Sequence, residues 1–264
     1  MTERNVLITG SSHGIGEAAA LAFAQQGYNV GINCNRNPDL AEEVAKKARA
    51  FGVKANVYIA DVADSAEVER MMNAFFADFG HIDVLVNNAG GALKMPSGGF
   101  DEMPVDYWDY QVRLNLSQAA YTSRLAIKNM KEHGIHGRIV NISSVHASVT
   151  YVRRKALPYC AAKAGLEMLT KALGVEAIKY GINVNCIAPG FISTHATTRY
   201  NEAELNAFLR KIPAGRLGKV EDVVPMILFL ADEEKSRFLV GQTIVIDGGQ
   251  SIDGAIDYML DQPI

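Results

Sequence analysis

The chain has 264 residues, of which 48% are hydrophobic and 21% are charged, and its formal net charge is -3. This composition excludes an intrinsically disordered chain and a fibrous repeat. The slightly acidic charge, without a long block of lysine or arginine, excludes an electrostatic surface for nucleic acid or for an anionic membrane.

Two further features of the sequence narrow the class of protein. There is no stretch of about 18 consecutive apolar residues and no signal-peptide pattern at the N-terminus, so neither a membrane span nor secretion is expected. The three cysteines, Cys34, Cys160 and Cys186, are widely spaced, which argues against a disulfide scaffold or a zinc site. We therefore expect a soluble cytoplasmic protein.

Short apolar runs alternate with longer helical patterns along most of the chain. The runs predict about seven strands, at Val6–Thr9, Tyr28–Asn33, Ala55–Ala60, Ile82–Asn87, Arg138–Ser143, Asn183–Ala188 and Thr243–Ile246. Helices are predicted at Gly14–Gln26, Asp39–Phe51, Asp64–Phe79, Asp106–His133 and Pro158–Tyr180. Most of the strands are apolar on both faces, which favours burial between helix layers. The alternation predicts an α/β protein with one domain over residues 1–264, a doubly wound parallel sheet (Rossmann fold) with helices on both faces.

Two stretches interrupt this alternation. Gly90–Pro104 reads as a loop, and Pro189–Gly218 contains only a short helical pattern at Glu202–Lys211. Because ligands of open α/β sheets bind beyond the carboxyl ends of the strands, both stretches are candidate substrate walls. We expect residues 189–218 to form a substrate lid.

The first predicted strand runs directly into a glycine-rich turn that opens a helix: Gly10, Ser11, Ser12, His13, Gly14, Ile15 and Gly16. Glycines let the backbone turn tightly and approach a pyrophosphate closely, and a helix N-terminus supplies N–H groups and a partial positive charge. A glycine-rich turn alone is also an ordinary loop. Its place after the first strand of an alternating pattern favours phosphate binding.

A tyrosine and a lysine stand four residues apart at the start of a long predicted helix. This spacing places Tyr159 and Lys163 on one helix face, one turn apart. A nearby ammonium favours the phenolate and lowers the phenol pKa, so that the phenol exchanges a proton with a carbonyl or alcohol oxygen. Surface pairs with the same spacing are common, so the interpretation depends on the accompanying motifs.

The accompanying motifs resemble those of the short-chain dehydrogenase/reductase family, in order and over nearly the whole chain. They are Thr9-Gly10-x-x-x-Gly14-x-Gly16, Asn87-Asn88-Ala89-Gly90, Ser144, Tyr159-x-x-x-Lys163, Pro189-Gly190 and Asp247-Gly248-Gly249. The resemblance implies an oxidoreductase that transfers a hydride between a nicotinamide cofactor and a secondary alcohol or carbonyl.

The same resemblance implies four catalytic residues: Asn115, Ser144, Tyr159 and Lys163. Tyr159 acts as the acid or base, while Lys163 binds the nicotinamide ribose and lowers the tyrosine pKa. Ser144, rather than Ser143 on the opposite face, polarises the substrate oxygen. Asn115 holds a water molecule that links Lys163 to solvent. No metal is required by this chemistry.

The end of the second predicted strand bears on the choice of cofactor. An acidic residue there reads the 2′-hydroxyl of NAD, and an arginine reads the 2′-phosphate of NADP. The sequence here is Asn33-Cys34-Asn35-Arg36-Asn37, without a carboxylate. Arg36 therefore predicts NADP(H), with NAD(H) as the alternative if Arg36 is only a solvated loop cation. His13 weakens the prediction, because NADP-dependent relatives often carry Arg or Lys at that position.

The resemblance adds further cofactor-binding residues along the chain: Asp61, Val62, Asn88, Gly90, Ile192 and Thr194. Asp61 and Val62 resemble the pair that contacts adenine, although Asp61 is also a candidate helix N-cap, a role that Asp64 suits at least as well. Ile192 and Thr194 match positions that hold the nicotinamide carboxamide.

The natural substrate stays open. A basic tract before the tyrosine contains His146, Tyr151, Arg153, Arg154 and Lys155, and it either attracts an anionic substrate or is a solvated loop. Trp108, His195 and Arg199 are candidate polar contacts that packing or solvent exposure also explains, and Arg216 lies in a run that resembles a recurring segment of the family and implies a structural role. The run from Ser143 to His146 resembles glucose 1-dehydrogenases, whereas the general pattern resembles 3-oxoacyl-acyl-carrier-protein reductases. A cofactor-sensing protein without catalysis is the alternative from another class.

The last predicted feature is a C-terminal tail, residues 251–264, which is apolar at several positions. Such a tail often packs across a subunit boundary. The predicted helices Asp106–His133 and Pro158–Tyr180 resemble those that pair in family dimers and tetramers. We expect a homotetramer.

Overall fold

The computed structural model of the protein describes residues 3–93, 99–150, 156–194 and 201–252. In these residues, seven parallel strands form one sheet in the order β3-β2-β1-β4-β5-β6-β7. The strands are β1 (Arg4–Ile8), β2 (Tyr28–Cys34), β3 (Ala55–Ile59), β4 (Val84–Asn87), β5 (Arg138–Ile142), β6 (Asn183–Pro189) and β7 (Thr243–Ile246). The predicted doubly wound parallel sheet is confirmed.

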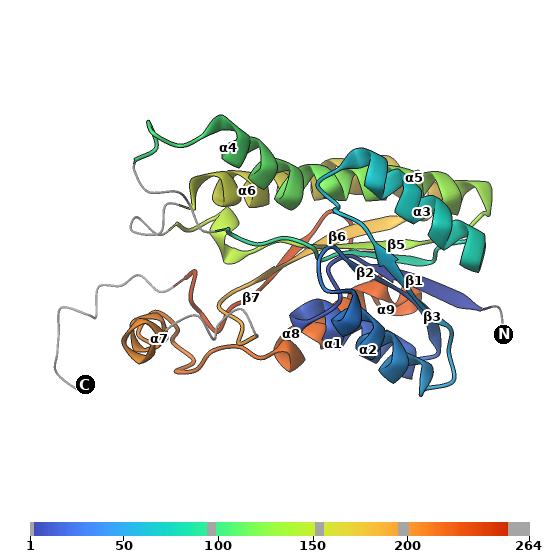
Figure 1. The fold of residues 1–264 in the computed structure, drawn as a ribbon, viewed down its shortest axis with the longest axis horizontal. Coiled ribbons are helices and arrows are strands. Elements are labelled where there is room, and N and C mark those ends of the chain that lie inside the picture. The colour runs from blue at the N-terminus through green and yellow to red at the C-terminus, as the bar shows by residue number, and fades with distance from the viewer. Residues whose placement is uncertain (1–2, 94–98, 151–155, 195–200, 253–264) are drawn as a thin grey trace.

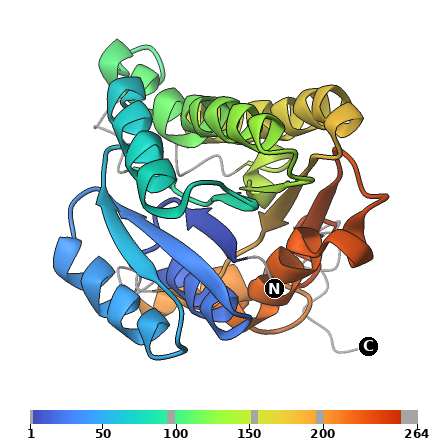
Figure 2. The same ribbon diagram turned by 90° about the vertical axis from the view of Figure 1, so that its right-hand side faces the viewer.

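Helices cover both faces of the sheet (Figures 1 and 2). One layer contains α3 (Ser65–Phe79), α4 (Val105–Val112), α5 (Gln118–Glu132) and α6 (Leu157–Ala177), and the other contains α1 (Gly14–Gln25), α2 (Pro38–Arg49) and α8 (Val220–Ala231). Two apolar cores result, because side chains alternate between the faces of a strand. On β1, Val6 and Ile8 pack into the core beneath α1, and Leu7 packs into the core beneath α3 and α5.

The helix ends follow local chemistry. Asp64, and not Asp61, is the N-cap of α3, because its carboxylate accepts hydrogen bonds from the N–H groups of Ala66 and Glu67 at 2.8 and 3.1 Å. After the C-terminal end of α1, Gly27 has a φ of 83°, a conformation that glycine adopts without strain. Both the N-cap alternative at Asp64 and the predicted end of the first helix are therefore confirmed.

The prediction of one continuous helix over Asp106–His133 is wrong, because the helix is interrupted. The structure divides it into α4 and α5, joined by a π-helical turn, η1 (Arg113–Ser117). Such turns interrupt the regular hydrogen-bond ladder and occur frequently at functional sites. The turn contains Asn115, so the interruption falls on one of the residues expected in the active site.

Shorter elements complete the description. They are the 3-10 turns η2 (Val145–Ala147) and η4 (Ile178–Tyr180), and the helices α7 (Glu202–Leu209) and α9 (Glu233–Ser236). Sequence analysis predicted α7 but assigned neither α8 nor α9. Among the described residues, no helix combines the length and apolarity that crossing a bilayer requires. The tail beyond residue 252 lies outside the described residues.

A chain of buried side-chain hydrogen bonds joins the two central strands beneath the candidate site. The Asn87 amide donates to Asn141 Oδ1 at 2.9 Å and accepts from the Thr122 hydroxyl at 2.6 Å. The Asn141 amide donates in turn to the Thr170 hydroxyl at 2.8 Å. All four residues are fully buried, so their hydrogen bonds fix β4, β5, α5 and α6 relative to one another.

Replacing Asn141 with alanine removes the middle of this chain. The variant Asn141→Ala leaves the Asn87 amide without its strand partner and opens a cavity, so we expect the free energy of unfolding to fall by about 2–4 kcal/mol in urea denaturation. The matched control is Asn56→Ala, which removes a solvent-accessible hydrogen bond from β3 to Asp78. That control is expected to cost less than about 1 kcal/mol. Equal losses for the two variants would contradict the prediction.

Candidate active site

The ammonium of Lys163 lies buried beneath the carboxyl ends of β5 and β6. Lys163 is only 3% exposed, and its Nζ donates a hydrogen bond of 2.7 Å to the carbonyl oxygen of Ile142, the last residue of β5. Tyr159 stands one turn earlier on α6 and is half-buried, and its ring centroid is 5.7 Å from Lys163 Nζ. The structure thus brings together the phenol and the ammonium that the sequence placed on one helix face.

Burial changes the pKa values of two groups at this site, the Lys163 ammonium and the Cys186 thiol. Burial lowers the pKa of Lys163 to about 8, because the charged ammonium is removed from water, and the acceptor of its hydrogen bond is a neutral carbonyl oxygen. Burial also raises the pKa of the nearby Cys186 thiol to about 12. Cys186 therefore stays neutral at physiological pH and is not a nucleophile.

Asn115 is held at the π-helical turn by its side chain. Its Oδ1 accepts a hydrogen bond from the Gly91 N–H at 2.8 Å, and its Nδ2 donates to the Gln111 carbonyl at 3.0 Å. Gly90 lies between the two polar groups of the site: a Cβ placed there would be 2.7 Å from Asn115 Oδ1 and 3.3 Å from Lys163 Nζ. The loop after β4 therefore closes over the lysine only because residue 90 lacks a side chain.

The two serines that end β5 have different roles in the structure. The Ser143 hydroxyl donates to the carbonyl of Lys163 at 3.2 Å, so it ties β5 to α6. Ser144 begins the turn η2, where its Oγ accepts from the His146 N–H at 3.2 Å. The His146 ring lies edge-on to the Tyr159 ring, with 6.1 Å between centroids. The turn that Ser144 begins therefore carries His146 to the Tyr159 ring, while the role of Ser144 stays a prediction.

The glycine-rich turn is fastened to the second strand by a residue that sequence analysis did not assign to the site. Asn33 Oδ1 accepts from the Gly10 N–H at 3.0 Å, and the Asn33 carbonyl accepts from the Ser11 N–H at 2.9 Å. The Asn33 amide also donates to the Ala60 carbonyl at 3.2 Å. The N–H groups of Gly10 and Ser11 already donate hydrogen bonds to Asn33. The backbone N–H groups that remain for a phosphate are therefore those of the first turn of α1. The sequence feature that could have indicated this role of Asn33 is an asparagine at the end of a buried strand.

The three glycines of the turn serve different purposes. A Cβ at Gly10 would lie 2.9 Å from Ala89 Cα, and one at Gly16 would lie 2.5 Å from the Gly10 carbonyl oxygen, so both positions exclude a side chain by packing. Asn88 closes the turn from the other side, since its amide donates to the Thr9 and Gly10 carbonyls at 2.9 Å. Gly14 has a φ of 63°, and a Cβ placed there would lie 3.4 Å from the side chain of Thr194. The turn and the segment after β6 therefore border one space.

The tip of β3 carries Asp61 and Val62. Asp61 Oδ1 accepts from the Ala63 N–H at 2.9 Å, and Oδ2 accepts from the Tyr110 hydroxyl at 3.2 Å, while Val62 is buried. Arg36 is exposed on the loop after β2, and its positive charge, like that of Arg113, acts to lower the pKa of Tyr110. Burial and the charge of Asp61 outweigh these effects and raise that pKa. Tyr110 and Arg113 were absent from the sequence-based site.

The segment after β6 is anchored at several points. Ile192 forms a parallel bridge to Gly218, and the Phe191 ring stacks on Phe208 of α7 at 4.1 Å between centroids. The Phe191 N–H donates to Gln250 Oε1 at 3.0 Å. Arg216, for which a structural role was expected, pairs with Asp222 at 2.7 Å, and Trp108 packs edge-on against Phe100. Tyr151, Arg153, Arg154, Lys155, His195 and Arg199 lie outside the described residues.

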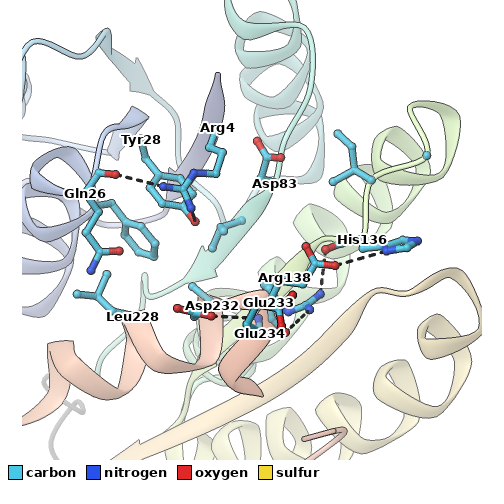
Figure 3. A pocket seen from close by; sticks show the side chains of 15 residues that line it. Arg4, Gln26, Tyr28, Asp83, His136, Arg138, Leu228, Asp232, Glu233 and Glu234 are labelled. Atoms are coloured by element: carbon cyan, nitrogen blue, oxygen red, sulfur yellow. Dashed lines mark hydrogen bonds and ion pairs between the residues drawn. The ribbon is translucent and has the colours of Figure 1, made fainter. Parts of the chain in front are cut away.

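A separate cavity of about 590 Å³ opens at the amino ends of the strands, away from this site (Figure 3). The two arginines that line this cavity, Arg4 and Arg138, make contacts that stabilise the fold. Arg4 lies over the Tyr28 ring at 4.1 Å and donates to the Tyr28 hydroxyl, while Arg138 donates to the carbonyls of His136, Gly137 and Gly181. Ligands of such sheets bind at the opposite, carboxyl ends of the strands. The candidate active site is therefore the cluster around Lys163.

Comparisons with known proteins agree with this geometry. A family model described as enoyl-(acyl carrier protein) reductase matches residues 10–251. Glucose 1-dehydrogenase 2 of Bacillus subtilis is 33% identical over 256 residues, with 96% of each chain covered. The 3-oxoacyl-acyl-carrier-protein reductase FabG of Staphylococcus aureus is 36% identical over 249 residues, covering 93% of this chain and 97% of the relative. The crystal structure of acetoin dehydrogenase YohF from Salmonella typhimurium superimposes with a TM-score of 0.84 at 32% identity, covering 96% of this chain and 97% of that one.

The buried ammonium generates a stability prediction. The pKa of Lys163 is lower in the folded state, about 8, than its ordinary value of 10.5, so burial of the charge destabilises the fold fully below about pH 8. This penalty is relieved as the pH rises from about 8 to 10.5. We expect Lys163→Met to raise the free energy of unfolding at pH 7 by about 1–3 kcal/mol, measured by denaturation of the cofactor-free protein.

The pH dependence distinguishes this cause from better packing alone. The difference between Lys163→Met and the natural protein should shrink as the pH rises from about 8 to 10.5, because the lysine becomes neutral in the folded state first and is neutral in both states only above pH 10.5. A variant that is less stable than the natural protein at pH 7 would contradict the prediction.

Proposed function

The chain belongs to the short-chain dehydrogenase/reductase family of oxidoreductases, whose members act on CH–OH or carbonyl groups, and on this basis we propose that it interconverts a secondary alcohol and a ketone or aldehyde with NADP(H). One observation carries the proposal. A phenol, Tyr159, lies one helical turn from a buried ammonium, Lys163, at the carboxyl ends of the strands, with Ser144 and Asn115 around it.

In this proposal the protein moves one proton at the substrate oxygen. During reduction, the Tyr159 hydroxyl donates its proton to the oxygen of the carbonyl that is being reduced, and during oxidation the Tyr159 phenolate takes the alcohol proton. The Lys163 ammonium stabilises the phenolate electrostatically, which is effective because the site is shielded from water. The Ser144 oxygen accepts from the His146 N–H, which leaves its own proton to donate to the substrate oxygen.

Asn115 and Lys163 are proposed to restore the proton that Tyr159 gives away. Their polar groups flank Gly90, which leaves space beside Lys163 Nζ because it has no side chain. A water molecule held beside Asn115 would connect the ammonium to solvent, as the family resemblance implies. The lowered pKa of Lys163, about 8, favours this role, because an ammonium with such a pKa releases and regains a proton near neutral pH.

The residues present fit a nicotinamide dinucleotide, which when bound would supply or accept the hydride. The first turn of α1 offers backbone N–H groups and a partial positive charge to a pyrophosphate, next to the space between Gly14 and Thr194. We propose that the whole glycine-rich turn lies against the cofactor, with the N–H groups of the first turn of α1 as the phosphate donors: Gly10, Ser11, Ser12, His13, Gly14, Ile15 and Gly16. Lys163 and Tyr159 would hold the nicotinamide ribose, with Asn88, Gly90, Ile192 and Thr194 around the nicotinamide half.

The preference for NADP(H) over NAD(H) rests on the end of β2. Arg36 is exposed there, and between Asn33 and Asn37 the sequence has no carboxylate that would read a 2′-hydroxyl. The guanidinium of Arg36 would form charge-assisted hydrogen bonds with a 2′-phosphate. Asp61 and Val62, at the tip of the next strand, would then contact adenine.

The substrate is proposed as a small molecule with a secondary alcohol or carbonyl. Glucose, acetoin and a 3-oxoacyl group, which the three relatives' names give as substrates, all contain such a carbon–oxygen bond. An NAD(H)-dependent sugar or polyol dehydrogenase is the second candidate, favoured by the run Ser143-Ser144-Val145-His146 and by the position of His146 against the Tyr159 ring. We also propose assembly as a cytoplasmic homotetramer, supported by exposed apolar side chains on α6, where Met168 is 62% and Val175 is 75% exposed.

The proton-transfer role of Tyr159 is tested by Tyr159→Phe, which removes the acid but keeps the ring. With a panel of sugars, hydroxyketones and 3-oxoacyl thioesters, kcat/KM should fall by about 10²- to 10⁴-fold, measured by the change in NADPH absorbance. NADPH affinity should fall by no more than about tenfold, because only one hydrogen bond to the ribose is removed. If the natural protein binds NADPH tightly but turns over no member of the panel, it is a cofactor sensor and the enzyme proposal is wrong.

The cofactor preference is tested by Arg36→Ala. Because hydrogen bonds to a charged group contribute about 1.5–3 kcal/mol, the KM for NADPH should rise by about 10- to 100-fold while the KM for NADH stays the same. The control is Arg237→Ala, an exposed arginine that pairs weakly with Glu234 at 3.9 Å. An equal rise for NADPH and NADH would show that Arg36 does not read the 2′-phosphate.

A further inference from the structure

A tyrosine from α4 reaches across the site to the strand tip that carries Asp61. The Tyr110 hydroxyl donates to Asp61 Oδ2 at 3.2 Å, and the two residues are 49 positions apart in the sequence. The other carboxylate oxygen, Oδ1, accepts from the Ala63 N–H at 2.9 Å. Both oxygens of Asp61 are thus held, and the plane of its carboxylate is determined by one local and one long-range hydrogen bond.

This carboxylate is not needed to cap the following helix. Asp64 is the N-cap of α3 and accepts from the first N–H groups of that helix. Glu67 of the same helix accepts from the Asp61 N–H at 2.7 Å, which fixes the backbone at Asp61 as well. Asp61 is therefore oriented more firmly than its structural role requires, and each carboxylate oxygen keeps a second lone pair for another donor.

The position of Asp61 connects it with the glycine-rich turn. Ala60, the preceding residue, accepts a hydrogen bond from the Asn33 amide, and Asn33 Oδ1 holds the Gly10 N–H. A dinucleotide whose pyrophosphate lies at the start of α1 would place its adenosine over the tips of β2 and β3. The amino group of adenine is a donor that matches a carboxylate oriented in this way.

We propose that Tyr110 is a positioning residue for the adenosine half of the cofactor: its hydroxyl fixes the Asp61 carboxylate in the orientation that accepts a hydrogen bond from the adenine amino group. This inference rests on the proposed use of a nicotinamide dinucleotide. Burial, together with the charge of Asp61, raises the pKa of Tyr110, so the phenol stays protonated and remains a donor throughout the neutral range. Without the hydroxyl, the carboxylate would have to be ordered when the cofactor binds, which weakens binding.

The test uses ADP as the probe, because ADP is common to NAD and NADP and its binding does not depend on the choice between them. In Tyr110→Phe, the Kd for ADP, measured by isothermal titration calorimetry, should rise by about three- to tenfold. The KM for NADPH should rise by the same factor without a matching loss of kcat. The KM for reduced nicotinamide mononucleotide, which has no adenosine, should not follow this rise.

A double-mutant cycle separates positioning from a merely structural role. In the Asp61→Ala background, Tyr110→Phe should have no further effect on ADP binding, because the carboxylate it orients is gone. The matched control is Tyr107→Phe, which removes a hydroxyl from the same helix that donates to the Leu93 carbonyl at 3.0 Å and does not contact Asp61. Thermal unfolding of all variants shows whether they are folded.

Each outcome decides between the proposals. A loss confined to Tyr110→Phe and abolished by Asp61→Ala supports the inference. Equal losses for Tyr110→Phe with and without Asp61, an equal loss for Tyr107→Phe, or unchanged ADP affinity would overturn the positioning role while leaving the proposed function intact. If the natural protein binds neither ADP nor NADPH, the cofactor proposal fails, and the inference about Tyr110 fails with it.

Discussion

A single buried ammonium constrains the whole catalytic side of this protein. Lys163 is buried, and its Nζ has a carbonyl oxygen rather than a carboxylate as its hydrogen-bond acceptor. A carbonyl dipole offsets only part of the cost of burying a charge, which is why we expect an apolar side chain at this place to stabilise the fold. The surrounding structure accommodates the charge: Gly90 omits a side chain beside it, and the π-helical turn brings Asn115 to the same place. For the proposed reaction, this costly position places a proton reservoir beside Tyr159.

The side of the site that we propose for adenosine is held together by different interactions. There the connections are hydrogen bonds between polar groups whose partners are all supplied by the fold, as with Asn33, which bridges the glycine-rich turn and the tip of β3. Such bonds make the turn rigid without a large cost in stability. The Tyr110 hydroxyl extends the same arrangement to α4, a helix that ends directly before the turn containing Asn115. The two halves of the site are consequently joined through one continuous backbone segment.

Local sequence signals predicted most of the fold because they arise within single segments. Runs apolar on both faces mark buried parallel strands, and glycine ends helices where a positive φ is needed. The signals failed where a helix depends on its neighbours. The apolar positions Val223, Ile227 and Leu230 follow helical spacing in α8, which also contains Pro225, and no helix was assigned there. The π-helical turn Arg113–Ser117 has no sequence signature either, since its residues follow the pattern of a regular helix. The backbone departs from regular helical geometry where the Asn115 side chain bonds to Gly91.

The sequence by itself determined the seven strands, most of the helices between them, the glycine-rich turn, and the pairing of Tyr159 with Lys163 on one face, because each depends on residues close together in the chain. The depth at which Lys163 is buried, the hold of Asn33 on the turn, and the contact between Tyr110 and Asp61 were decided only by the tertiary structure. Burial and hydrogen-bond partners are set by segments that are remote in sequence and meet only when the sheet assembles, so no local pattern encodes them.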